Sequence, residues 1–75
     1  MPYKIGTKQT TRAVEQGIAA RVIVAGDADP RITGKIIELC AQAQVVIERV
    51  DTMEMLGETC GIDVGAAMAA WIPEE

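Results

Sequence analysis

The chain has 75 residues, of which 49% are hydrophobic, and its formal net charge at pH 7 is −4. This length allows one domain, residues 1–75, and the apolar content argues against disorder. Taken alone, the negative charge argues against a nucleic-acid binder, because phosphate contacts supply most of the affinity of such proteins. The charge is nevertheless uneven. The first twelve residues contain three cations and no acid, whereas acids crowd the end of the chain, at Asp51, Glu54, Glu58, Asp63, Glu74 and Glu75. We therefore predict a small basic face on an acidic protein.

The first predicted elements are a short edge strand within residues 1–5 and a helix over residues 8–16. Tyr3 and Ile5 alternate with polar residues, as in a strand. Thr7 is a good helix N-cap, and Gly6 before it allows a sharp turn into the helix.

Lys8, Gln9 and Arg12 fall in the first turns of this helix. Positions 8 and 12 are four apart and share one face, which position 9 borders. Unpaired backbone N–H groups at a helix start favour an anion, so this cluster suits phosphates and the acceptor edge of guanine. The alternative is an ordinary solvated helix start, and spacing alone favours that alternative.

The middle of the chain predicts a central strand, residues 21–25, and a second helix, residues 30–43. The strand is a β-branched run typical of a strand buried on both faces. Asp29 is a natural N-cap, and Pro30 suits the first helical position. Asp27 and Asp29 also raise the possibility of a magnesium site, although a turn with an N-cap explains them better. The expected apolar stripe is Ile32, Ile36, Leu39, Cys40 and Ala43.

The last third predicts a strand at residues 45–47 that ends where residues 48–50 turn polar. Asp51 and Glu54 resemble a capping box for a third helix, which Gly61 ends. A final strand is expected within residues 66–72. The third helix is expected to bury Met53, Leu56 and Cys60.

The segment from Gly61 to Gly65 contains more apolar surface than a turn requires. It lacks the lysine and the strand-to-helix context of a P-loop, which argues against nucleotide hydrolysis. Ile62 and Val64 either lie in an exposed loop beside Asp63 or belong to the core under the last strand. The residues alone favour the core.

Catalysis has few candidate residues. The chain has no His and no Ser, and its carboxylates lie in helix caps and tails, so we predict no catalytic residue and no enzyme activity. Cys40 and Cys60 lack metal-ligand spacing and are expected to be buried thiols, with no metal or cofactor bound. No apolar run is long enough for a membrane span, and no signal peptide is visible, which indicates a cytoplasmic protein with no membrane or small-molecule partner.

Three segments together resemble the kink-turn RNA-binding ribosomal protein family, that of the archaeal large-subunit protein "seven-A-e" and its short bacterial relatives. They are residues 6–12, residues 27–30 and residues 60–67, and the similarity extends in order from Ile5 to Ile72. The predicted element order already implies an α/β domain. With the resemblance, we expect a three-layer α/β/α sandwich around a small mixed four-stranded sheet, without the helix that family members usually have before the Gly-Thr motif.

The resemblance implies a non-catalytic protein that stabilises kink-turns in structured RNA, ribosomal RNA among them. The helix start would read guanines of tandem sheared G·A pairs, and the loop would contact unstacked nucleotides. Lys8 stands where many members have Asn, Gln9 where they have Glu, and Arg12 where they have Lys. The alternative is a protein-interaction or regulatory module that keeps the fold without RNA recognition. The expected RNA-binding residues are Gly6, Thr7, Lys8, Gln9, Arg12, Ile62, Asp63 and Val64.

Overall fold

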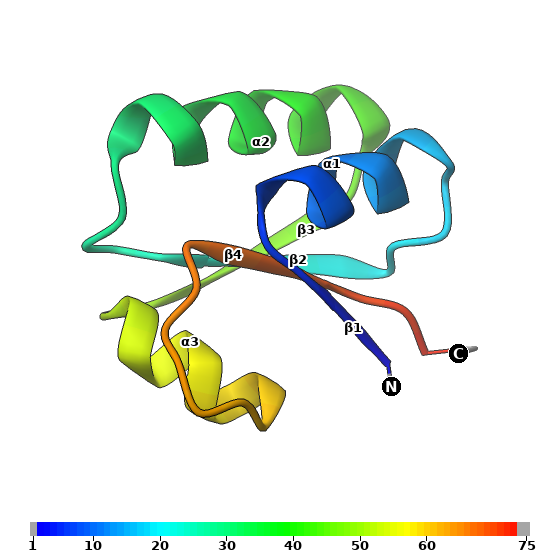
Figure 1. The fold of residues 1–75 in the computed structure, drawn as a ribbon. Helices are drawn as coiled ribbons and strands as arrows, with labels where there is room; N and C mark the ends of the chain where they lie inside the picture. The colour runs from blue at the N-terminus through cyan, green and yellow to red at the C-terminus, as the bar shows by residue number, and fades with distance from the viewer. Residues whose placement is uncertain (1, 74–75) are drawn as a thin grey trace.

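The computed structural model describes residues 2–73, so Glu74 and Glu75 of the acidic end lie outside it. Strands and helices alternate along the chain, and the sheet has the order β1-β4-β2-β3 (Figure 1). β2 pairs in parallel with β3, whereas β4 is antiparallel to β1 and β2. The elements are β1 (Tyr3–Ile5), α1 (Thr7–Glu15), β2 (Arg21–Ala25), α2 (Pro30–Ala43), β3 (Val46–Val50), α3 (Met53–Cys60) and β4 (Met68–Trp71).

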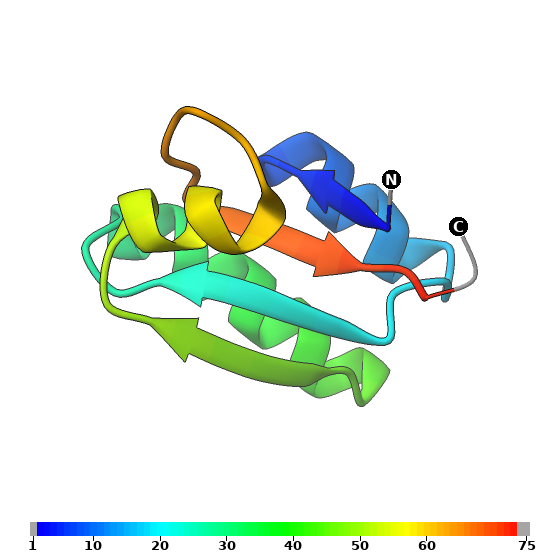
Figure 2. The ribbon, with the colours of Figure 1, turned by 90° about the horizontal axis from the view of Figure 1, so that it is seen from below.

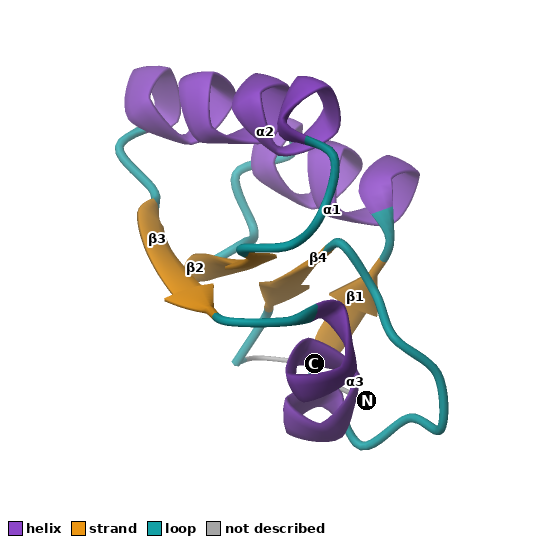
Figure 3. Ribbon diagram, turned by 90° about the vertical axis from the view of Figure 1, so that its left-hand side faces the viewer, coloured by secondary structure: helices purple, strands orange, loops and turns teal. Residues whose placement is uncertain are grey.

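α1 and α2 cover one face of the sheet, and the shorter α3 covers part of the other (Figures 1 and 3). The predicted three-layer α/β/α sandwich around a mixed four-stranded sheet is therefore confirmed. In the part of the chain that the structure describes, no helix has the length and apolar character needed to cross a bilayer.

The core lies on both sides of β2, as the sequence predicted. Val22, Ile23, Val24 and Ala25 are each at most 3% exposed. Alternate side chains of a strand point to opposite faces, so Val22 and Val24 contact the α1/α2 layer while Ile23 and Ala25 contact the α3 layer.

The two cysteines belong to this core, one on each side of the sheet. Cys40 is fully buried among the residues under α2, and Cys60 is 6% exposed in the cluster under α3. Burial raises the pKa of both thiols, since a thiolate would lose its hydration. Both are free and buried, as predicted.

β3 differs from the prediction, which ended this strand where residues 48–50 turn polar. The strand continues to Val50 because it pairs with β2 over its whole length, up to the pair Ala25 and Val50. The backbone N–H of Gly26 then donates to the Val50 carbonyl at 2.8 Å. Glu48 and Arg49 are exposed, which an edge strand with one free side allows.

The N-cap of α3 also differs from the prediction. Asp51 was expected to cap the helix, but the Thr52 hydroxyl accepts from the Met55 N–H at 3.0 Å. The Met53 N–H instead donates to the Asp27 carboxylate at 2.8 Å, 26 residues away in sequence. A long-range partner thus takes one free N–H of the helix start, and the cap shifts by one residue.

The predicted apolar stripes are partly wrong at their ends. Ile36 and Cys40 of α2 and Leu56 of α3 are buried, as expected. Ile32 is 39% exposed and Met53 is 37% exposed, and each lies in the first turn of its helix. Ala43, the last residue of α2, is also exposed.

The end of the sheet beyond α3 contains the two aromatic residues of the chain. Tyr3 of β1 pairs in register with Trp71 of β4, and Trp71 pairs with Arg21 of β2. The Arg21 guanidinium carbon lies 4.5 Å from the Trp71 ring centroid, and one of its nitrogens lies 3.4 Å from a Glu48 oxygen. Seen from below, this end of the sheet has no helix over it (Figure 2).

Candidate nucleic-acid interface

The start of α1 is fixed by Gly6 rather than by Thr7, which corrects the predicted N-cap. Gly6 has φ 97° and ψ 165°, a backbone conformation that side chains strongly disfavour, and no side chain caps the helix. Its N–H donates to the Met68 carbonyl at 3.0 Å, and its carbonyl accepts from Thr10 N–H at 2.9 Å. These bonds make Gly6 the last residue before the helix and place Thr7 in the first turn.

The first turn of α1 is electrostatically positive. It has no acidic residue and no side-chain hydrogen bond to its free N–H groups, while Lys8 adds a full positive charge. A cation at a helix N-terminus opposes the helix dipole and destabilises the helix by about 0.3–1 kcal/mol. The same arrangement attracts anions, because uncapped N–H groups and an ammonium group lie together.

Buried residues on the opposite side of α1 hold this helix against the sheet. Thr10, Ala13 and Val14 are at most 3% exposed, and the Thr10 hydroxyl donates to the Lys4 carbonyl at 3.3 Å. Gln9 and Arg12 are consequently exposed. They line a shallow hollow of about 200 Å³ on the β1 side of α1, together with Lys4, Ala13, Gln16 and Ile18.

A larger groove of about 610 Å³ separates α1 from α2. Thr7 and Thr11 line it from α1, and Arg31 and Lys35 line it from α2. Sequence reasoning did not include these two cations. Neither residue belongs to the predicted apolar stripe of α2, and the Asp29-Pro30 start of this helix was explained by capping alone.

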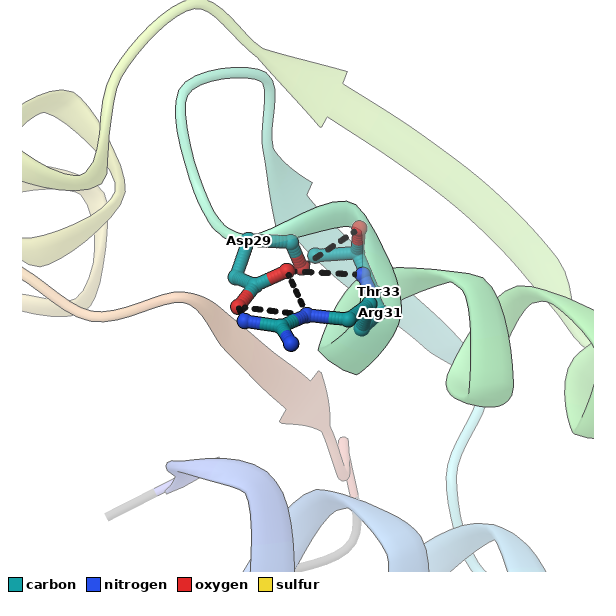
Figure 4. A network of polar contacts seen from close by, with 3 residues as sticks. All are labelled: Asp29, Arg31 and Thr33. Atoms are coloured by element: carbon teal, nitrogen blue, oxygen red, sulfur yellow. Dashed lines mark hydrogen bonds and ion pairs between the residues drawn. The ribbon is translucent and has the colours of Figure 1, made fainter.

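Arg31 is held in place at this groove by Asp29 (Figure 4). The Asp29 carboxylate accepts from the Arg31 backbone N–H at 2.9 Å, which confirms it as the N-cap of α2. It also accepts from the Arg31 guanidinium, with the shortest distance at 2.9 Å. The guanidinium, followed by the backbone N–H, lowers the pKa of Asp29, and the carboxylate raises the pKa of Arg31.

The loop between α3 and β4 presents one apolar side chain to solvent. Val64 is 69% exposed, whereas Ile62 is partly buried against the cluster under α3. Asp63 between them is exposed. The structure therefore divides the two alternatives left by the sequence, since Ile62 contacts the core and Val64 does not.

The α1 start and the Val64 loop lie at the same end of the sheet. The loop leads into Met68, the first residue of β4, whose carbonyl accepts from Gly6 N–H at 3.0 Å. Figures 1 and 3 show the loop rising from α3 past this end of the sheet to the level at which α1 begins. The loop that contains Val64 therefore joins the sheet beside the start of α1, although α1 and α3 cover opposite faces.

Comparison with known proteins decides the family. Residues 2–75 match the ribosomal protein L7Ae/L30e/S12e/Gadd45 family. The chain belongs to this family. The resemblance stated from sequence is thereby confirmed, since the L7Ae family is the one that the three segments indicated.

Individual relatives of this L7Ae-family chain are described as RNA-binding proteins. It is 52% identical over 68 residues to one from Geobacillus sp. (strain WCH70), covering 91% of this chain and 83% of that protein. It is 48% identical over 66 residues to another from Halalkalibacterium halodurans, covering 88% of this chain and 80% of that protein. A solved structure of the Giardia lamblia 15.5 kD RNA-binding protein superimposes with a TM-score of 0.87 at 28% identity, covering 95% of this chain and 60% of that longer one.

Proposed function

We propose that this L7Ae-family protein binds structured RNA containing a kink-turn and stabilises its bent form without catalysing a reaction. The observation that supports this most strongly is the proximity of a positive helix start and an exposed apolar loop at one end of the sheet. Family membership and the names of the relatives support RNA as the partner. Within that class, ribosomal RNA is the target that the family description favours.

In this proposal, the start of α1 contacts guanine edges and nearby phosphates. Lys8 and Arg12 donate to guanine O6 or N7, and Gln9 offers both a donor and an acceptor. The major groove of unbent A-form RNA is too narrow for side chains. The proposal therefore requires that the kink opens this groove. Lys8→Ala or Arg12→Ala should each cost about 1–3 kcal/mol of binding if both make such contacts.

The loop then contacts the nucleotides that the kink unstacks. Val64 offers a methyl-bearing surface to an exposed base, and burial of a valine side chain contributes about 1.5–3 kcal/mol. A protein that binds only the bent RNA shifts the RNA population towards that form. The acidic remainder of the protein, with net charge −4, disfavours RNA that offers only phosphates.

A titration against two RNAs tests the proposal. One is a kink-turn stem-loop, and the other is the same stem with its G·A pairs converted to Watson–Crick pairs, each at two salt concentrations. Strong preference for the first RNA with a shallow salt dependence is expected, because few phosphates are neutralised. Binding to neither RNA would instead indicate the protein-interaction or regulatory module. Equal affinity for both RNAs would refute specific recognition of the kink-turn.

A further inference from the structure

A glycine lies in the middle of α3, where the sequence alone gives no reason for it. Gly57 is buried, and glycine in a helix interior is less favourable than alanine by about 1 kcal/mol. A Cβ atom at this position would overlap the carbonyl oxygen of Val64. By contrast, Gly34 in the middle of α2 has no atom within 4 Å of the corresponding position. Close approach of the Val64 loop therefore accounts for Gly57 and not for Gly34.

The same loop is attached to α3 at both of its ends. The Ile62 N–H donates to the Gly57 carbonyl at 3.0 Å, and the Ala66 N–H donates to the Met53 carbonyl at 3.1 Å. A Cβ atom on Gly65 would lie only 3.2 Å from the Met53 Cβ. Two backbone hydrogen bonds and two glycine contacts thus fix a short segment on the helix.

α3 is in turn fixed to the rest of the domain. Its Leu56 and Cys60 are buried against the sheet, and the Asp27 carboxylate accepts from the Met53 N–H at 2.8 Å. The helix therefore acts as a rigid support, and the position of Val64 depends on how closely the loop backbone can approach it. Val64 keeps its 69% exposure because its own carbonyl, and not its side chain, faces Gly57.

We propose that Gly57 is a positioning residue that sets the place of Val64 and thereby gives the protein its selectivity for RNA with unpaired nucleotides at the kink. This inference rests on the proposed function. It predicts that Gly57 affects one part of the RNA footprint only. Contacts of the α1 start with paired guanines should be independent of it, since α1 and α3 lie on opposite faces of the sheet.

The test compares wild-type protein, Gly57→Ala and the matched control Gly34→Ala. Each is titrated with a kink-turn RNA and with the same RNA made abasic at its unpaired kink nucleotides. Wild type and Gly34→Ala should bind the intact RNA about tenfold more tightly than the abasic one, which is the scale of burying one aliphatic side chain. Gly57→Ala should bind both RNAs equally, at the affinity that wild type shows for the abasic RNA.

A readout on the free protein accompanies the titration. Amide hydrogen exchange at Ile62 and Ala66 should accelerate in Gly57→Ala and stay unchanged in Gly34→Ala, because both protecting hydrogen bonds join the loop to α3. If Gly57→Ala does not fold, Gly65→Ala takes its place, since its Cβ atom meets Met53 from the loop side.

The outcomes separate the two proposals. Wild-type protein that binds neither RNA refutes the proposed function. Wild-type protein that prefers the intact RNA, with a folded Gly57→Ala variant that keeps this preference, refutes the positioning role alone. The positioning role is also refuted if Gly57→Ala loses affinity for both RNAs by the same factor, because the effect would then be general and not confined to the unpaired nucleotides.

Discussion

Reversing the charge of Lys8 should raise the stability of the protein and lower its affinity for RNA. Lys8 is exposed in the first turn of α1, which has no acid and no side-chain cap. Lys8→Glu removes an unfavourable interaction with the helix dipole and introduces a favourable one, each of about 0.3–1 kcal/mol, for a net gain of about 1 kcal/mol. In a domain of this size, that gain corresponds to a rise in melting temperature of about 4–8 °C. Binding should weaken at least tenfold, the order expected when one base contact is lost.

Thermal denaturation and titration with the kink-turn RNA measure the two effects on the same samples. Arg49→Glu is the matched control, because it is an exposed residue on β3, at the sheet edge opposite β1. Both substitutions change the net charge from −4 to −6, a difference of two charges. A loss of stability in Lys8→Glu contradicts the dipole argument. Equal losses of affinity in the two variants contradict a specific role for Lys8, since general repulsion would then explain both.

Other predictions concern the remainder of the domain. Gly34→Ala should raise the free energy of unfolding by about 0.5–1 kcal/mol in urea titrations without changing RNA affinity, because its Cβ atom meets nothing. Asp29 has a lowered pKa in the folded protein, so its contribution to stability is present above its ordinary pKa of 3.8 and is lost as the pH falls through the lower folded value. Urea midpoints between pH 5 and pH 2 should therefore fall more steeply for wild type than for Asp29→Asn, and parallel curves contradict this. Cys40 and Cys60 should not react with a thiol reagent at pH 8 until the protein unfolds, whereas immediate labelling of the native protein contradicts their burial.

Elements with strong local signals could be predicted from the sequence. β2 was predicted with its observed bounds because a β-branched run of five residues is too short for a buried helix. α2 was predicted with its observed bounds because Asp29 and Pro30 mark its start. Gly61 ends α3, as expected, and the structure shows it in the left-handed conformation. Each of these signals depends only on neighbouring residues.

The features that could not be predicted depend on partners distant in the chain. Gly6 replaced Thr7 as the N-cap of α1 because its N–H bonds to Met68. Thr52 replaced Asp51 as the N-cap of α3, where the Asp27 carboxylate accepts from the Met53 N–H. The same holds for the site. Residue types predict a site at Lys8, Gln9 and Arg12, but only the folded chain shows the α1/α2 groove with Arg31 and Lys35.

The stacking of Arg21 on Trp71 has a practical consequence for experiments on this protein. Trp71 is the one tryptophan in the sequence, and its neighbours in register belong to β1 and β2. Its fluorescence should therefore report whether the two antiparallel pairings of β4 are intact. Trp71 is the last residue of β4, whereas the start of α1 and the loop that contains Val64 adjoin Met68, the first residue of that strand. We expect the emission of Trp71 to change when the protein unfolds and to stay constant when RNA is added. Trp71 would then report the integrity of the sheet independently of RNA binding, without an added label.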